Sequence, residues 1–280
     1  MPDETTFSPD TLFDLIGTAE APVVIDARTD EDFAADPRLI PAAIRRPGLK
    51  AADWAGAYGG REVVVYCERG LKISQGAAAW LRHAGAKAAS LEGGFQAWQA
   101  TGLPLVPQDK LPPRDAADRT LWVTRARPKI DRIACPWLIR RFVDPGAVFL
   151  FVAPSEVAAV ADRFCATPFD IEGVHWSHRG ERCTFDVMVE ELGLGTGPLL
   201  HLATIVRGAD TARPELAPEA AGLLAASLGL SRMYGDDLAQ LEAGMALYDA
   251  FYRWARDAVA ETHNWPAVKT EIRDAQYSSR

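Results

Sequence analysis

No apolar run in this 280-residue chain approaches the roughly 20 residues that a membrane-spanning helix needs. The first four residues, Met1-Pro2-Asp3-Glu4, also lack the basic start that is typical of a secretory signal peptide. The four cysteines lie in four different sequence contexts and do not form the framework of a disulfide-rich domain. We therefore expect a soluble, cytoplasmic protein with no membrane partner, whose cysteines are reduced thiols.

An excess of positive charge is absent as well. Residues 1–108 contain 14 acidic and 10 basic side chains and the remaining residues contain 24 and 20, so each part has a net charge of −4. Nucleic-acid binding usually requires a basic surface for phosphate contacts, so the composition argues against direct contact with nucleic acid. With 48% hydrophobic residues, the chain is long enough for two domains with separate cores. Nothing in these patterns specifies an oligomeric state.

Cys67 ends an apolar run, residues 63–66, that predicts a buried strand. A helix is predicted from residue 75, with Ser74 as its candidate N-cap. A cysteine between a strand and a helix start has backbone N–H groups and the positive end of the helix dipole near its sulfur. The intervening loop consists of Glu68, Arg69, Gly70, Leu71, Lys72, Ile73 and Ser74. Because this loop includes two basic residues, we expect the Cys67 thiol to be reactive and to favour its deprotonated form, the thiolate. The alternative is a buried apolar cysteine.

Three further segments accompany the Cys67 loop: Val23 to Arg28, Leu39 to Ala43, and Leu91 to Trp98 followed by Gly102-Leu103-Pro104. In this order they resemble the rhodanese (sulfurtransferase) family over residues 8–108. The resemblance implies an α/β domain with a mainly parallel central sheet. It implies that Cys67 attacks the outer sulfur of thiosulfate or another sulfane donor and passes it, as a persulfide, to a thiol or cyanide. It also implies that the N–H groups of residues 68–74 hold the persulfide, that Asp26 and Arg28 form a structural pair, and that sulfur transfer needs no cofactor.

The loop is one residue longer than the usual sulfurtransferase loop. In that loop an Arg lies five residues after the Cys, where this chain has Lys72, and Ser74 falls one residue late. The related phosphatases and arsenate reductases use a longer loop around a tetrahedral oxyanion but close it with an Arg, where this chain has Ile73. Phosphoryl transfer is therefore disfavoured, whereas a sulfane sulfur or a weakly held oxyanion stays open as the ligand.

A proline-rich segment separates the two predicted domains. Residues 104–115 contain four prolines and no apolar periodicity, which is typical of an extended linker. We place the first domain at 1–108, the linker at 109–118 and the second domain at 119–280; the alternative is an arm packed on the second domain. The pattern of the second domain predicts an α+β fold that is mostly helical after residue 184. Its expected strands are 121–124, 147–152, 174–178 and 183–185, the last two around a turn at 179–182.

Four motifs of the second domain resemble the ChrB-type chromate-resistance family over residues 120–258. They are Lys129 to Phe142, His178 to Asp186, Ile205 to Asp210, and Tyr248-Asp249-Ala250. The resemblance implies a role in bacterial chromate resistance, either by sensing chromate or by handling it.

His178 and Cys183 flank the predicted turn, so their Cβ atoms would lie about 5 Å apart across a hairpin. A paired imidazole and thiol could ligate a metal, and Glu190 and Asp210 on the following helices are candidate carboxylate ligands. Zinc or iron would suit this mixture of nitrogen, sulfur and oxygen. The alternative is a hydrogen-bonded turn with solvated carboxylates.

Asp131 and Arg132 begin an apolar helix, where charged residues are commonly caps or surface pairs. Their place in the longest motif of the second domain favours a second site, in which Arg132, Arg140 and Arg141 together could attract a dianion such as chromate or sulfate. The alternative is that the three arginines form a solvated face. The leading hypothesis for the whole chain is a sulfurtransferase that forms a persulfide on Cys67 and is joined to a chromate-resistance domain. Its partners would be a small sulfane donor and a thiol acceptor. The alternative is a sensor that responds to chromate or another oxyanion, with a non-catalytic rhodanese module.

Overall fold

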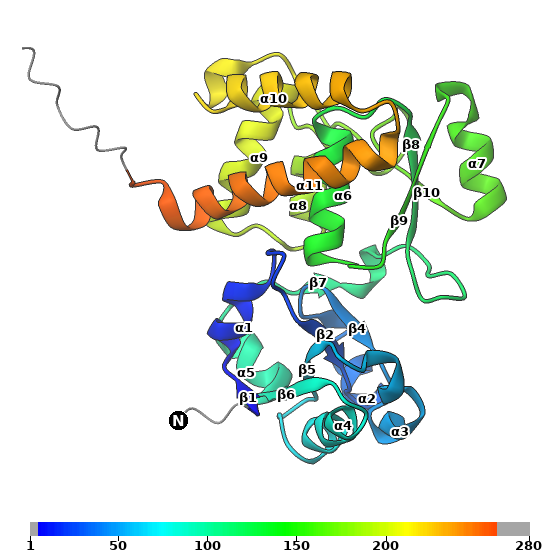
Figure 1. Cartoon of the computed structure of the whole chain (residues 1–280), viewed down its shortest axis with the longest axis vertical. Helices are drawn as coiled ribbons and strands as arrows, with labels where there is room; N and C mark the ends of the chain where they lie inside the picture. Colours follow the sequence, from blue (N-terminus) through cyan, green and yellow to red (C-terminus); the bar gives the residue numbers. More distant parts are fainter. Residues whose placement is uncertain (1–4, 262–280) are drawn as a thin grey trace, which may run out of the picture.

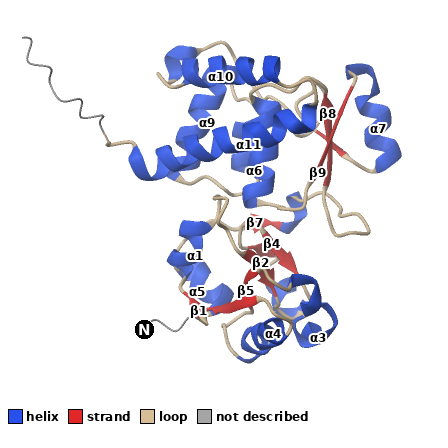
Figure 2. Ribbon diagram, in the orientation of Figure 1, coloured by secondary structure: helices blue, strands red, loops and turns tan. Residues whose placement is uncertain are grey.

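The computed structural model describes residues 5–261, which form two stacked parts (Figure 1). The acidic start at residues 1–4 and the end of the second domain at 262–280 lie outside the described residues. Strands gather mainly in the first part and helices in the second (Figure 2). The parallel sheet of the first part and the mostly helical second part confirm the fold class expected from the sequence.

The first domain is built on a five-stranded sheet whose strands are all parallel and follow the order β1-β6-β5-β2-β4. The strands are β1 (Thr6–Phe7), β2 (Val23–Asp26), β4 (Ala43–Arg45), β5 (Glu62–Tyr66) and β6 (Lys87–Leu91). The helices are α1 (Pro9–Leu15), α2 (Asp30–Ala35), α3 (Ala51–Trp54), α4 (Lys72–His83) and α5 (Gly94–Ala100). A separate antiparallel pair joins β3 (Arg38–Leu39) to β7 (Val106–Pro107).

Strand β5 shows why its run of valines is continuous. Val64 and Tyr66 pack in the cluster that includes α1 and α5, whereas Val63 and Val65 pack in the cluster that includes α3 and α4. Alternate side chains of a strand point to opposite faces, and both faces of this parallel sheet are covered by helices. The absence of polar alternation in residues 63–66 is thus explained by burial on both sides.

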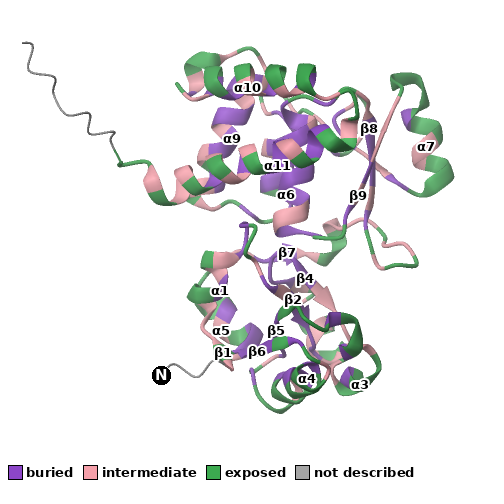
Figure 3. Cartoon of the chain, in the orientation of Figure 1, coloured by how far each residue is buried: buried purple, intermediate pink, exposed green. Residues whose placement is uncertain are grey.

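The second domain places a small parallel sheet, in the order β10-β8-β9, beside a group of helices. Its strands are β8 (Leu121–Arg125), β9 (Val148–Val152) and β10 (Thr167–Pro168). Its helices are α6 (Asp131–Phe142), α7 (Val157–Phe164), α8 (Thr184–Glu191), α9 (Gly197–Asp210), α10 (Ala220–Met233) and α11 (Asp237–Arg253). Helix α6 lies at the centre of the group and is buried along most of its length (Figure 3).

The two strands expected at 174–178 and 183–185 are wrong. The region contains isolated bridges and no strand: Arg179 pairs with Arg182 in antiparallel fashion, Phe169 pairs with Trp176 in parallel fashion, and α8 begins at Thr184. The backbone N–H of Cys183 donates to Asp186 Oδ2 at 3.0 Å, a bond that closes the first turn of α8. A carboxylate at the third helical position that accepts from the N-cap N–H stabilises a helix start. The capping bond therefore explains why the chain continues as a helix rather than as a strand.

One apolar cluster extends through both domains. It includes Leu12 and Ile16 of the first domain and Phe142 and Tyr252 of the second. The N–H of Ala42 donates to the carbonyl of Phe142 at 2.7 Å. A side chain at Gly17 would collide with Phe142, since an added Cβ would lie 2.3 Å from its Cζ. The two domains thus share a hydrophobic core and are not joined by the linker alone.

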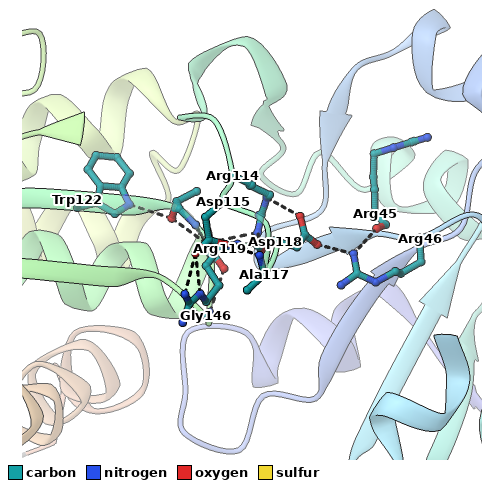
Figure 4. Close-up of polar contacts among 11 residues, drawn as sticks. Arg45, Arg46, Arg114, Asp115, Ala117, Asp118, Arg119, Trp122 and Gly146 are labelled. Carbon is teal, nitrogen blue, oxygen red and sulfur yellow. Dashed lines mark hydrogen bonds and ion pairs between the residues drawn. The ribbon is translucent and has the colours of Figure 1, made fainter. Parts of the chain in front are cut away.

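Polar contacts tie the predicted linker into this interface (Figure 4). Arg46, which follows β4, forms an ion pair with Asp118. The carbonyl of Asp118 in turn accepts from Arg114 Nη1 at 2.7 Å. Arg114 Nη1 also lies 3.4 Å from Asp144 of the second domain. These contacts connect residues 114–118 to both domains.

Glu191 contacts Lys110 of the same proline-rich segment, and this contact depends on pH. It pairs with Lys110 at 2.8 Å and with Arg179, and the hydrogen bonds from these two residues lower the pKa of Glu191 from 4.5 to about 2. A depressed pKa stabilises the folded state above pH 4.5, and this contribution is lost as the pH falls through 2. We expect Glu191→Gln to lower the free energy of unfolding at pH 7 and to have a smaller effect near pH 3. Urea denaturation at the two pH values would check this, and an equal loss at both would contradict it.

No helix within residues 5–261 is both long and apolar enough to cross a membrane.

Candidate functional site

Cys67 lies directly after β5, at the carboxyl end of the parallel sheet, and is 5% exposed. Its Sγ is 3.2 Å from the Oγ of Ser74. Helix α4 begins at Lys72, so the first N–H groups of this helix have no partner within it. These donors, together with the positive end of the helix dipole, lie next to the Cys67 loop and favour a negative charge there.

The expected N-cap at Ser74 is wrong. Leu71 occupies that position, and Ser74 is a fully buried residue of the first helical turn. The Oγ of Ser74 also lies 3.2 Å from the carbonyl oxygen of Leu71, to which it donates. The hydroxyl therefore serves as a neighbour of the Cys67 sulfur and not as a cap for the helix.

Two glycines hold the Cys67 loop against the start of α5. An added Cβ at Gly94 would lie 2.2 Å from the Cys67 carbonyl oxygen and 2.3 Å from the Gly70 nitrogen. Both glycines have positive φ angles, +67° at Gly70 and +61° at Gly94, where other residues are strained. The N–H of Phe95 donates to the Cys67 carbonyl at 2.9 Å. The Leu91-to-Trp98 motif thus holds the backbone of the Cys67 loop in place.

A pocket of about 520 Å³ opens over the Cys67 loop. Arg69 and Lys72 are exposed on its wall, and Glu68 accepts a hydrogen bond from Gln96 at 3.1 Å. The full lining is Asp32, Cys67, Glu68, Arg69, Leu71, Lys72, Ile73 and Gln96. The structure therefore brings the cysteine and the two cationic side chains of the predicted site to one cavity.

Asp26 and Arg28 pair with each other beneath this site. Both side chains are fully buried, and Arg28 Nη2 lies 2.8 Å from Asp26 Oδ2. The other Arg28 nitrogens donate to Asp26 at 3.1 Å and to the carbonyl of Asp36 at 3.0 Å. The guanidinium also lies 3.8 Å from the centre of the Phe95 ring. This pair connects the end of β2 to the loop after α2 and to α5.

A second cluster of ionisable groups lies in the second domain. His178 Nε2 is 3.2 Å from Asp210 Oδ2, 3.4 Å from Asp170 Oδ1 and 3.5 Å from Asp131 Oδ2. Asp131 is fully buried, whereas the side chain of His178 is 41% exposed. The four residues come from the start of α6, the loop after β10, the turn before α8 and the end of α9.

The backbone is constrained on both sides of this cluster. Ile130, just before Asp131, has a φ of 41°, which is unfavourable for a β-branched residue, and Asp170 has a φ of 52°. The N–H of Ile130 donates to Ser227 Oγ at 3.1 Å, and Tyr248 Oη donates to the Ile130 carbonyl at 3.0 Å. Bonds from α10 and α11 therefore stabilise the strained entry into α6.

Thr184 and two arginines complete the surroundings of the carboxylates. The N–H of Thr184 donates to Asp131 Oδ2 at 2.6 Å, and its hydroxyl bonds to Asp170 Oδ1 at 2.9 Å. Arg132 Nε and Arg125 Nη2 lie 3.3 Å and 3.2 Å from Asp170 Oδ2. Arg132, predicted as part of a second site with Asp131, thus pairs with Asp170.

Burial and hydrogen bonding within the cluster shift the pKa values of its members. Burial raises the pKa of Asp131 from 3.8 to about 7, although the hydrogen bond with His178 opposes this rise. Hydrogen bonds to Asp131, Asp170 and Asp210 raise the pKa of His178 from 6.5 to about 12. The neighbouring aspartates thus favour the protonated form of the imidazole.

The ligand set expected from the sequence is revised by this geometry. His178 and Asp210 do meet, but Glu190 is an exposed side chain that pairs with Arg182. Cys183 is fully buried, and burial raises the pKa of its thiol well above 9. Asp170 was not predicted, since a single aspartate after a two-residue strand has no diagnostic spacing. Among the described residues, the group that could hold a metal comprises Asp131, Asp170 and His178.

Comparison with known proteins assigns both parts. Residues 8–101 match the family described as "Rhodanese-like domain", and residues 122–255 match "ChrB, C-terminal domain". Protein ChrB of Cupriavidus metallidurans is 36% identical over 133 residues, which are 47% of this chain and 39% of that protein. The chain therefore spans well under half the length of this curated relative.

Several solved structures resemble a part of the chain. A rhodanese-related protein from Thermoplasma volcanium is 23% identical and covers 36% of this chain and 97% of its own, with a TM-score of 0.32. A rhodanese-like domain protein from Staphylococcus aureus is 26% identical and covers 34% and 90%, with a TM-score of 0.31. A thiosulfate sulfurtransferase from Pseudomonas aeruginosa is 28% identical and covers 39% and 21%, with a TM-score of 0.32.

A parallel sheet with a cysteine loop after its central strand β5, together with the family match, defines a rhodanese-like domain. The chain joins this domain, at residues 8–101, to a ChrB C-terminal domain, at residues 122–255.

Proposed function

We propose that the chain is a sulfurtransferase in which Cys67 accepts a sulfur atom and releases it to a second nucleophile. The observation that supports this most is the position of the Cys67 sulfur. It lies beside the Ser74 hydroxyl at a pocket whose wall includes the cations Arg69 and Lys72. A thiolate is the reactive form of cysteine, and nearby cations and helix N-termini favour it.

The proposed reaction balances in two steps. The Cys67 thiolate attacks the outer sulfur of thiosulfate, the bond between the two sulfurs of the donor breaks, and sulfite leaves with the electron pair. The outer sulfur stays on Cys67 as a persulfide, which loop N–H groups of residues 68–74 stabilise. Cyanide or a thiolate then attacks this sulfur, and the Cys67 thiolate is released as the leaving group. The reaction needs no metal or organic cofactor.

The second domain suggests where this chemistry is used. Its family relationship connects the chain to ChrB, so we place the sulfur transfer in chromate resistance. A persulfide would supply reduced sulfur during or after chromate stress. Small-molecule donors and acceptors fit the open pocket over Cys67 better than a macromolecular substrate does.

A substitution at Lys72 tests how the protein binds the sulfur donor. Lys72 lines the pocket, where its ammonium would meet the sulfonate end of thiosulfate. We expect Lys72→Ala to raise the KM for thiosulfate about fivefold at low salt, the size of one solvent-screened charge contact. The effect should shrink as the ionic strength rises, since salt screens exposed charges.

Lys87→Ala is the matched control. Lys87 is exposed and pairs with Glu62 at the amino ends of β6 and β5, the end of the sheet opposite to Cys67. Its removal should leave the KM for thiosulfate unchanged. Equal values for both variants and the wild type would exclude Lys72 as a donor contact.

The alternative is a sensor whose pocket binds an oxyanion without transferring sulfur. The longer loop and the Ile73 side chain at the position of the phosphatase arginine favour this function over phosphoryl transfer. A thiosulfate:cyanide assay separates the two functions, because a binding module forms no thiocyanate.

A further inference from the structure

The acidic cluster around His178 has the size of a metal site. Ligand atoms from Asp131, Asp170 and His178 all lie within 4.8 Å of one another. Zinc bonds to nitrogen and oxygen are about 2.0–2.2 Å, so neighbouring ligand atoms of a tetrahedral ion lie about 3.4 Å apart. The distances from His178 Nε2 to Asp170 and Asp131, 3.4 Å and 3.5 Å, match this spacing.

Asp131 supplies an independent reason to expect a cation. Its side chain is fully buried, yet Oδ1 has no hydrogen-bond partner. No lysine or arginine pairs with this carboxylate in the described part of the chain, whereas Arg125 and Arg132 both lie against Asp170. A buried oxygen of a carboxylate without a partner is costly unless a proton or a metal ion satisfies it.

The cluster is also accessible to a solvated ion. His178 and Asp170 line a pocket of about 320 Å³, together with Arg125 and Ser177. An ion held on the inner side by Asp131 would keep a coordination position open toward this pocket. Asp210, whose Oδ2 is 3.2 Å from His178 Nε2, is a further carboxylate next to the imidazole.

We propose that His178 Nε2, Asp131 and Asp170 bind a first-row divalent cation, for which Zn²⁺ is the best fit. One imidazole and two carboxylates suit a borderline ion, and the short distances suit four-coordination better than the larger shell of Ca²⁺. When the ion is bound, it replaces the proton on the imidazole. The site belongs to the second domain and does not depend on sulfur transfer at Cys67.

Zinc binding to the full-length protein tests the proposal. After treatment with a chelator and its removal, titration with Zn²⁺ should show one ion per chain and raise the melting temperature, because a ligand of the native state stabilises it. His178→Ala should weaken Zn²⁺ binding at least about 100-fold. Asp131→Asn, which keeps the shape but removes the charge, should do the same.

His175→Ala is the matched control. This histidine is three residues away, is 55% exposed and lies 3.9 Å from Glu191. Its removal should leave the affinity for Zn²⁺ unchanged. If Asp131→Asn fails to fold, the surface variant His178→Ala still decides the question. Absence of stoichiometric Zn²⁺ binding to the wild type, or equal binding by His178→Ala, would overturn the proposal.

Discussion

Cys67→Ser should reduce thiosulfate:cyanide sulfurtransferase activity by at least about 1000-fold, as expected for the loss of a nucleophile. Serine is nearly isosteric, but its oxygen cannot hold a transferred sulfur as a persulfide. The folded state should change little, because the new hydroxyl can still bond to Ser74, whose Oγ lies 3.2 Å from Cys67 Sγ. Activity is measured from thiocyanate formation, and folding from the urea-unfolding curve.

Cys165→Ser provides the control for this variant. Cys165 is the exposed cysteine at the end of α7 in the second domain, away from the Cys67 pocket. The activity of Cys165→Ser should equal that of the wild type. Full activity in Cys67→Ser, or an equal loss in both variants, would exclude Cys67 as the nucleophile.

Asp26→Ala should lower the free energy of unfolding by about 3–5 kcal/mol, the usual cost of removing one partner of a buried ion pair. The side chains of Asp26 and Arg28 are both fully buried, and their closest atoms are 2.8 Å apart. Without Asp26, the guanidinium would keep its bonds to the carbonyls of Asp36 and Arg38 but would have lost its nearest counter-charge. Urea denaturation would measure the loss.

Asp30→Ala is a matched change a few residues away. Asp30 pairs with Arg45 at 2.8 Å, but its carboxylate is fully exposed to water. Exposed pairs contribute little to stability, so this variant should unfold close to the wild type. A similar loss in both aspartate variants would show that burial does not set the strength of the Asp26–Arg28 pair.

The sequence predicted the first domain more accurately than the second for a physical reason. The strand, loop and helix around Cys67 depend on local patterns: an apolar run, a turn and a helix start. The position of Ser74 was misjudged because the chain already becomes helical at Lys72. In the second domain, the prediction of a hairpin did not take Asp186 into account. The carboxylate of Asp186 caps α8 by accepting a hydrogen bond from the Cys183 N–H.

The carboxylate cluster could not be assembled from spacing alone. Asp131, Asp170, His178 and Asp210 are far apart along the chain, and only the packing of α6, α8 and α9 brings them together. The link between His178 and Asp210 was predicted, because both lie in motifs of the second domain. Asp170 has no such motif, and its left-handed backbone conformation is visible only in the structure.

The intact mass of the protein after exposure to thiosulfate shows whether Cys67 carries transferred sulfur. The wild type should gain about 32 Da, the mass of one sulfur atom, and should lose it again when cyanide or a thiol is added. Cys67→Ser should show no gain under the same conditions. A wild-type protein without the added mass, or an equal gain in Cys67→Ser, would exclude Cys67 as the carrier of the transferred sulfur.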